Sequence, residues 1–159
     1  MHSDDQVERA GLAASQRNLK IISRPRAELK PDLANPRQHS KKQIQQIAKS
    51  ISIFGFNVPV LVDAELNVIA GHGRLLACGA LGIDEVPTVC LEHLTPAQAR
   101  AFRIADNKLT ENATWDDRLL AEQLRDLSLS GLDFDIEVTG FEMGEIDLRI
   151  ASRGHARRR

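Results

Sequence analysis

The spacing of apolar residues changes along the chain and predicts a mixed order of strands and helices. Short β-branched runs at Leu19–Ile22, Val58–Val62, Val68–Ala70 and Val86–Leu91 are typical of strands, and Pro25 is expected to end the first of them. A short loop separates the second run from the third, which favours a hairpin. Between the first two runs, apolar residues at helical spacing predict a helix with one core-facing side: Ile44, Ile47, Ala48 and Ile51.

Residues with capping chemistry set the ends of two predicted helices. Ser40 and Gln43 predict a capping box at the start of the first helix, and Gly55 is placed to end it. Thr95–Gln98 predicts the start of another helix, because the threonine can cap, the proline suits the first turn and the glutamine can reach back. The apolar side of that helix, expected to pack on the sheet, consists of Ala99, Phe102, Ile104 and Ala105.

Beyond Thr110 the pattern becomes helical. One helix is predicted between Thr114 and Gly131, and its apolar face consists of Trp115, Leu119, Leu120, Leu124 and Leu127. Asp133–Phe141 alternates like a short strand or an extended arm, and Gly144–Ile150 predicts one last short helix. The strong helix lacks a convincing recognition partner, so the helix-turn-helix that reads DNA sequence is not expected.

Composition places the chain among globular proteins. Its 159 residues are 42% hydrophobic and 27% charged, which suits one domain with one core. No apolar run is long enough to span a bilayer, and acids within residues 1–16 argue against a targeting peptide, so we expect a cytoplasmic protein with a flexible leader. Cys78 and Cys90 lie within apolar patterns and are expected to be free thiols.

The net charge of −1 hides an uneven distribution. Residues 17–49 carry nine lysines and arginines against two acids, whereas residues 51–152 carry seven against seventeen. A short basic tail, residues 151–159, ends the chain. We therefore expect any contact with nucleic acid to be weak, salt-sensitive, confined to these basic segments and without sequence preference.

The candidate chemistry centres on Asn67–Leu81, which we interpret as a strand, a tight turn and a helix. Gly71 and Gly73 give the backbone freedom to turn, and the free amides at the start of the helix favour an anion. Arg74 can hold a phosphate through two parallel hydrogen bonds and is then expected to face solvent, while His72 supplies a further donor or a titratable group. The alternative is a glycine-bearing turn with a surface arginine and no ligand.

Further segments occur in a fixed order around this turn: Leu29–Pro31, Asn35–Arg37, Ile47–Gly55, Pro59–Val62, Ala70–Ala77 and Leu81–Pro87. Together they resemble the N-terminal domain of the ParB family over about Leu19–Leu109. Ile104–Lys108, Asn112–Asp116 and Asp135–Phe141 look most like the ParB-like modules attached to phage and bacterial DNA methylases. The resemblance implies an α/β (α+β) fold of the ParB and sulfiredoxin-like type, with a mixed sheet, packed helices and a C-terminal helical extension.

The expected organisation follows from the resemblance and the charge pattern. It consists of a flexible leader at residues 1–16, a ParB-like nucleotide-binding core at 17–109, a helical extension packing on the core at 110–150, and a basic tail at 151–159.

The resemblance also implies roles for individual residues. In ParB partition proteins the turn aligned with Gly71–Arg74 has the sequence Gly-Glu-Arg-Arg and binds the triphosphate of CTP, which implies phosphate binding by Gly71, His72, Gly73 and Arg74. The family's Glu-Asn pair, which helps to hold Mg²⁺, aligns with Asp106 and Asn107, whose oxygen atoms suit magnesium. Asn35 and Arg37 precede the first helix and are further candidates for polar contacts. Since His72 replaces a glutamate, steps that need a carboxylate there are not expected.

We therefore expect a ParB-like module that binds a nucleoside triphosphate, CTP favoured, with Mg²⁺, in a DNA-directed system such as DNA modification, partition or phage biology. The expected partners are DNA, contacted weakly or indirectly, a DNA methylase or another DNA-processing protein, and a second copy of the chain. Alternatives are a nuclease-like or accessory module of a DNA methyltransferase, and an interaction scaffold with a vestigial site.

No catalytic residue can be assigned from the sequence, and weak nucleotide hydrolysis or nuclease activity stays open. The chain lacks the clustered carboxylates of two-metal nucleases, and His72 stands where sulfiredoxin has its cysteine. Because the chain contains no tyrosine, it cannot carry the Asp-Pro-Pro-Tyr motif of adenine methylases.

Overall fold

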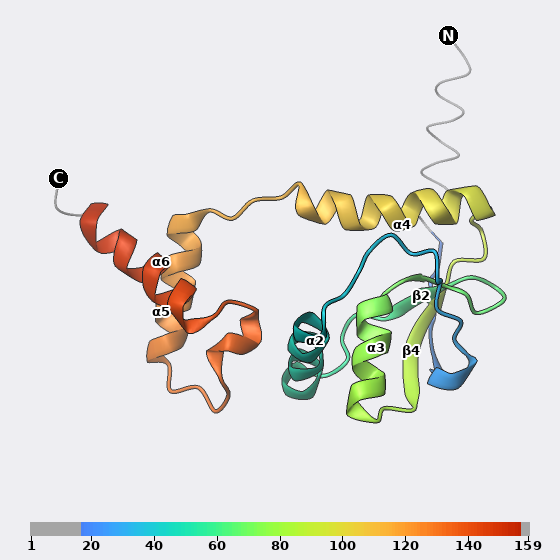
Figure 1. Ribbon diagram of the computed structural model, residues 1–159, viewed down its shortest axis with the longest axis horizontal. Coiled ribbons are helices and arrows are strands. Elements are labelled where there is room, and N and C mark those ends of the chain that lie inside the picture. The colour runs from blue at the N-terminus through green and yellow to red at the C-terminus, as the bar shows by residue number, and fades with distance from the viewer. Residues whose placement is uncertain (1–16, 157–159) are drawn as a thin grey trace, which may run out of the picture.

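The computed structural model describes residues 17–156, so the predicted leader and the end of the basic tail lie outside the described residues. A mixed sheet and its helices form the first part of this chain, and a separate group of helices forms the last part (Figure 1). The elements are β1 (Ile21–Pro25), the 3₁₀ helix η1 (Arg26–Glu28), α2 (Lys41–Phe54), β2 (Val60–Val62), β3 (Val68–Ala70), α3 (His72–Leu81), β4 (Glu85–Cys90), α4 (Pro96–Glu111), α5 (Asp117–Leu129), the 3₁₀ helix η2 (Ile136–Thr139) and α6 (Met143–Ala156).

The sheet has the strand order β1-β4-β2-β3. The outer pairs are antiparallel and the central β2–β4 pair is parallel, which confirms a mixed sheet and the predicted β2–β3 hairpin. The first strand begins at Ile21 rather than Leu19 and ends at Pro25, as predicted. Because β3 lies at the edge of the sheet, the chain passes from that edge directly into the glycine turn and α3.

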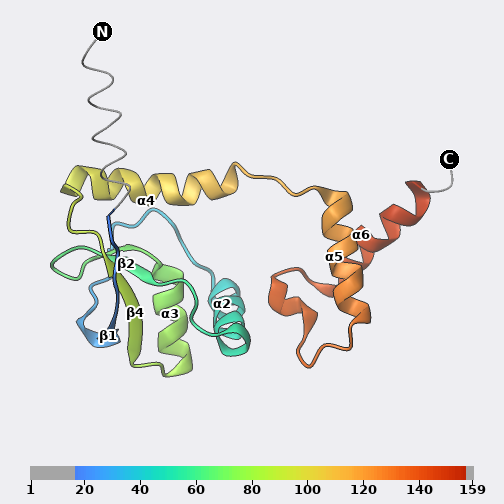
Figure 2. The same cartoon turned by 180° about the vertical axis from the view of Figure 1, so that it is seen from behind.

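Two apolar clusters cover the two faces of the sheet. On one face, α3 packs on the sheet with α2 beside it (Figure 2). That cluster consists of Leu29, Val60, Val62, Val68, Leu75, Cys78 and Val86. On the other face, Ala99 and Phe102 of α4 pack against Ile69, Val89 and Leu91, as predicted. Ile104 does not join them, because 59% of its surface is exposed.

The predicted caps fix the helix ends in the structure. Thr95 and Gln98 form a complete capping box at the start of α4. Ser40 accepts a hydrogen bond from the backbone N–H of Gln43 at 3.1 Å, but the Gln43 side chain contacts His39 instead of reaching back. Only one of the two hydrogen bonds of that predicted box therefore forms. The Gln43 side chain contacts His39, whose ring lies beside the glycine turn.

The C-terminal helices pack around a small core of their own and are joined to α4 by residues 112–116 (Figure 1). This core consists of Leu120, Leu124, Leu127, Leu132, Ile136, Phe141, Ile146 and Ile150. Asp133–Phe141 was predicted as a strand or arm, but its centre forms η2, because Asp135 caps a helical turn through the Glu137 N–H. Trp115 lies before α5, is 66% exposed and contacts Phe141 edge-on, so it is not part of the helical face.

α6 is longer than the predicted last helix and extends to Ala156. Within the described residues, no helix combines the length and the apolar character needed to cross a membrane. The division of the chain at residues 109 and 150 stays a prediction.

Candidate functional site

Gly71 forms the tight turn between β3 and α3. Its φ of +100° is a left-handed conformation that favours glycine. A Cβ atom at this position would lie 2.9 Å from Nη2 of Arg74 and 3.3 Å from the Cα of Val60. The glycine therefore permits both the turn and the close approach of the Arg74 guanidinium to the backbone.

Gly73 has a different role from the predicted one, because it lies inside α3 and has no positive φ. A Cβ atom there would lie 2.9 Å from Cδ1 of Ile47 and 3.0 Å from Cε1 of His39. This glycine lets α2 and the His39 ring approach α3, so it brings two further segments to the turn.

His72 is buried, and its ring is neutral, with one nitrogen that accepts a hydrogen bond and one that carries a proton. Only 9% of its surface is exposed, and its Nε2 accepts a hydrogen bond from the backbone N–H of Asp32 at 3.2 Å. An acceptor Nε2 places the ring proton on Nδ1. Burial lowers the pKa of His72, and the nearby Arg103 lowers it further. At neutral pH the ring therefore offers one N–H donor and no positive charge.

Arg74 is half-buried, which contradicts the expectation that it faces solvent. Its Nη2 donates to the carbonyl oxygen of Pro59 at 3.0 Å, whereas its buried Nε has no hydrogen-bond partner in the part of the chain that the structure describes. Burial lowers the pKa of the guanidinium, and the Asp106 carboxylate opposes this shift. Since arginine keeps its charge at physiological pH, the turn holds a partly desolvated cation with an unused donor.

One cavity of about 200 Å³ brings together every residue that the sequence analysis singled out. Its lining includes Gly71, His72, Gly73, Arg74, Asp106, Asn107, Asn35 and Arg37. These residues come from the loop before α2, the start of α3 and the middle of α4. Segments far apart in the sequence thus converge on the glycine turn.

Arg103, which was not predicted from the sequence, fixes this convergence. Arg103 is buried in α4, donates to the carbonyl oxygens of Ile69 at 3.0 Å and Val68 at 3.3 Å, and pairs with Asp32. Asp32 also donates its N–H to His72, so one residue joins the loop, the turn and α4. An arginine directly after Phe102, on the side of a helix that faces a sheet, was the available signal.

His39 and Gln43 also line the cavity and were not predicted. Nδ1 of His39 lies 3.0 Å from Oε1 of Gln43, a contact that holds the ring beside Gly73. Arg37 and Asn35 shape the same loop: Arg37 pairs with Glu111 of α4 at 2.6 Å, and Asn35 accepts the Arg37 N–H at 3.2 Å. The side chains of Asn35 and Arg37, both predicted as ligand contacts, thus already bind other groups of the protein.

Asp106 and Asn107 offer two oxygen ligands at the rim of the cavity. Asp106 is exposed, and the Asn107 amide donates through Nδ2 to the Arg103 carbonyl oxygen at 2.8 Å. Its Oδ1 is therefore the atom available to a cation. Among the described residues, no three His, Cys, Asp or Glu side chains gather as a metal cluster, so a Mg²⁺ ion here would need phosphate oxygens or water as its other ligands.

A larger cavity of about 460 Å³ adjoins the first and shares Asn35, Arg37, His39 and His72 with it. Apolar residues of η1, its C-cap and α3 supply much of the remaining wall: Ala27, Leu29, Leu75 and Leu76. A polar cavity that carries arginines thus lies beside a more apolar one, an arrangement suited to a ligand with an anionic end and a flat, less polar end.

Comparison with known proteins identifies the family. Residues 11–108, more than half of the chain, match the sequence model of the ParB N-terminal domain. The chain belongs to this family. It is 46% identical over 80 residues to the ParB-like nuclease domain-containing protein YnaK of Escherichia coli, covering 50% of this chain and 92% of that protein. It is also 33% identical over 96 residues to a probable chromosome 2-partitioning protein ParB of Deinococcus radiodurans, covering 58% of this chain and 32% of the relative.

The fold agrees with that of a solved ParB. The chromosome-partitioning protein ParB of Caulobacter crescentus, complexed with CTP-γ-S, superposes with a TM-score of 0.61 at 21% identity, covering 69% of this chain and 63% of that chain. A probable ParB of Rickettsia bellii is 25% identical over 154 residues, and the match spans 81% of this chain but about half, 51%, of the relative.

The C-terminal helices also match a known domain. Residues 118–156 match the sequence model of the ParB-methyltransferase HTH domain. The prediction that these residues lack a helix-turn-helix partner is therefore wrong. The second helix of the pair, α6, is longer than predicted, and the segment before it was expected to be extended, so the pair was not predicted from the sequence.

Proposed function

We propose that the chain binds a nucleoside triphosphate, with CTP favoured, in the two adjoining cavities. The observation that carries the proposal is the convergence of Arg74, Arg37 and Asp106–Asn107 on one cavity, which shares four lining residues with a neighbouring, more apolar cavity. The Arg74 guanidinium and the α3 amides would bind phosphates, and the apolar wall would receive the base. The Caulobacter ParB that shares the fold carries a CTP analogue, which supports this choice of ligand.

A bound Mg²⁺ would supply charge neutralisation between phosphate oxygens, with Asp106 and Asn107 as its protein ligands. The roles of this chain's own residues differ from one another. Arg74 neutralises phosphate charge, Gly71 permits its approach, and His72 donates a neutral N–H while it ties the Asp32 loop to the turn. We place this module in a cytoplasmic, DNA-directed system.

A second candidate function rests on the match of residues 118–156 to the ParB-methyltransferase HTH domain. We propose that the chain can serve as an accessory module of a DNA methyltransferase, with any methyl transfer carried out by a partner chain. Homodimerisation and weak contact with DNA belong to the same proposal.

Calorimetric titration with CTP, ATP, GTP and UTP in the presence of Mg²⁺ tests the nucleotide proposal. CTP should bind the unmutated chain and raise its thermal midpoint, because a ligand stabilises the state that binds it. Arg74→Met should weaken binding by about 1.5 to 3 kcal/mol, the range for a hydrogen bond to a charged group. The control Arg118→Met alters an exposed arginine of α5 and should leave binding unchanged. If no nucleotide binds the folded, unmutated chain, the proposal is wrong.

A further inference from the structure

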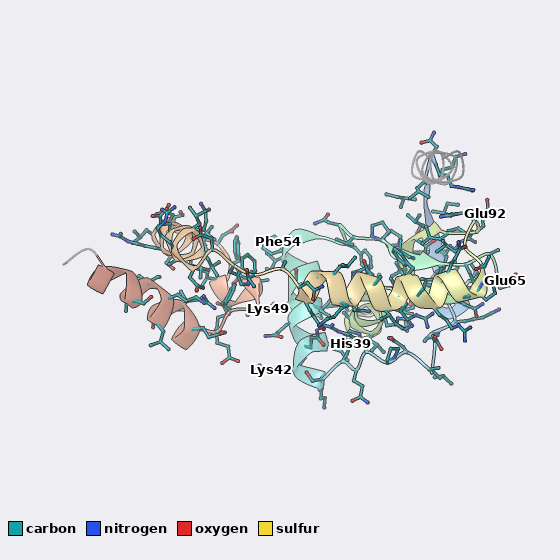
Figure 3. All side chains as sticks on the ribbon, turned by 90° about the horizontal axis from the view of Figure 1, so that it is seen from above. His39, Lys42, Lys49, Phe54, Glu65 and Glu92 are labelled. Atoms are coloured by element: carbon teal, nitrogen blue, oxygen red, sulfur yellow. The ribbon has the colours of Figure 1, made fainter. Side chains whose placement is uncertain are left out.

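The C-terminal helices contact the core through surface charges on α2. Lys42 pairs with Glu142, and Lys49 pairs with Asp135 at 2.8 Å. Phe54 meets Phe134 edge-on, with ring centroids 5.6 Å apart. Figure 3 shows Lys42, Lys49 and Phe54 along the side of α2 that faces the C-terminal helices. We call Lys42 and Lys49 the lysine stripe and residues 133–142 the strap.

The contact is built to be reversible. All four charged side chains are about half exposed or more, and exposed ion pairs are weak and screened by salt. The lysines lie seven residues apart, two turns or about 10.5 Å along the helix, so the strap spans the stripe with one carboxylate at each end. The stripe and the strap can therefore separate without unfolding either part.

The C-terminal helices are unusually acidic for a nucleic-acid-binding unit. Residues 118–156 carry eight acids against four arginines, whereas DNA-binding surfaces are basic. Two of these acids pair with lysines of the basic segment, residues 17–49. The strap thus places carboxylates where a polyanion would otherwise meet α2.

We propose that the strap is an autoinhibitory cover, in which Asp135 and Glu142 occupy a nucleic-acid backbone site formed by Lys42 and Lys49. Release of the strap lets the two ammonium groups contact phosphates of a duplex without base recognition. This inference does not depend on the nucleotide site, because it concerns the outer side of α2 and needs no nucleotide in its test.

The test uses the full chain and a fluorescently labelled mixed-sequence duplex at low salt, without nucleotide. The variant D135N/E142Q should bind the duplex about three- to tenfold more tightly than the unmutated chain, because it removes the two carboxylates that form ion pairs with the stripe. The control D126N/D147N removes two exposed acids of the same helices that make no contact with α2 in the structure. An equal gain in the control would mean that net charge alone acts, and would overturn the proposal.

A second set of variants tests whether the lysine stripe is the site that binds the duplex. Adding K42Q/K49Q to D135N/E142Q should abolish the gain in affinity. It should also lower the magnitude of the slope of log binding constant against log salt concentration by up to about two. If the gain survives, or if polyglutamate binds the released stripe while the duplex does not, the stripe is not a nucleic-acid site. Thermal melts of every variant confirm that the binding changes occur in folded chains.

Discussion

The α/β core and the C-terminal helices use charged side chains in opposite ways. In the core, Arg103 is buried, pairs with Asp32 and donates to two backbone carbonyls of β3. In the C-terminal helices, Glu142 and Asp135 form exposed pairs with α2. A buried charge must keep its partners, whereas an exposed pair can exchange them for water. The core is therefore suited to hold a fixed site, and the C-terminal helices are suited to move.

Arg103→Ala should produce the largest loss of stability. It leaves Asp32 without its cation and two β3 carbonyls without donors, so we expect a loss of about 3 to 5 kcal/mol in the free energy of unfolding. Arg125→Ala in α5 is the control and should change this free energy by less than about 0.5 kcal/mol, because it alters an exposed side chain. Denaturant unfolding measures both. Equal losses would remove the contrast between the two regions.

Gly73→Ala should have the next largest effect. Its Cβ would lie 2.9 Å from Ile47 and 3.0 Å from His39, which forces α2 away from α3 and costs about 1 to 3 kcal/mol. Gly144→Ala in α6 meets no atom within 4 Å, and should be neutral or stabilise by up to about 1 kcal/mol. Thermal melts compare the two, and a neutral Gly73→Ala would show that the helices can separate at no cost.

The glycines of the turn also show which features of the site could be predicted from the sequence. The pattern predicted the turn at Gly71, because a positive φ between a strand and a helix is a local property. It could not reveal the role of Gly73, which depends on the side chains of Ile47 and His39 from a distant segment. The predicted site residues do meet in one cavity, yet their hydrogen bonds, such as that from Asp32 to His72, depend on tertiary contacts with no sequence period.

The C-terminal helices were harder to predict for a related reason. A short amphipathic helix, a 3₁₀ turn and an acidic strap have weak periodicity, and their small core forms only when α5 and α6 meet. Asp133–Phe141 alternates in polarity, which is typical of a strand, but the Asp135 side chain favours a helical turn by accepting the Glu137 N–H. Local capping therefore prevailed over alternation.

A smaller effect concerns His72 of the core and the pH dependence of the free energy of unfolding. Burial lowers the pKa of His72 below its ordinary value near 6.5, so the unfolded chain binds more protons as the pH falls below that value. The contribution of neutral His72 is present above about pH 6.5 and is lost on acidification below it. His72→Gln keeps an acceptor for the Asp32 N–H and should flatten the pH profile of unfolding. The control His93→Gln, away from the turn, should leave the profile unchanged.

The smallest expected effect concerns the strap. Its groups are charged when paired, whereas folded His72 is neutral, yet both contributions are lost on acidification. Hydrogen bonds from Lys49 and Lys42 hold the pKa values of Asp135 and Glu142 below their ordinary values of 3.8 and 4.5. The pairs are therefore present above those values and are lost as the pH falls through the lowered ones.

Fluorescence energy transfer between dyes on α2 and α6 measures whether the strap opens at that acidic step while circular dichroism reports an intact core. At neutral pH, added salt should open the strap as well, since the pairs are exposed. D135N/E142Q should already be open at neutral pH and should respond to neither acid nor salt. If the dyes stay equally close in this variant, the Phe54–Phe134 contact alone holds the C-terminal helices, and the two regions differ less in mobility than their charges indicate.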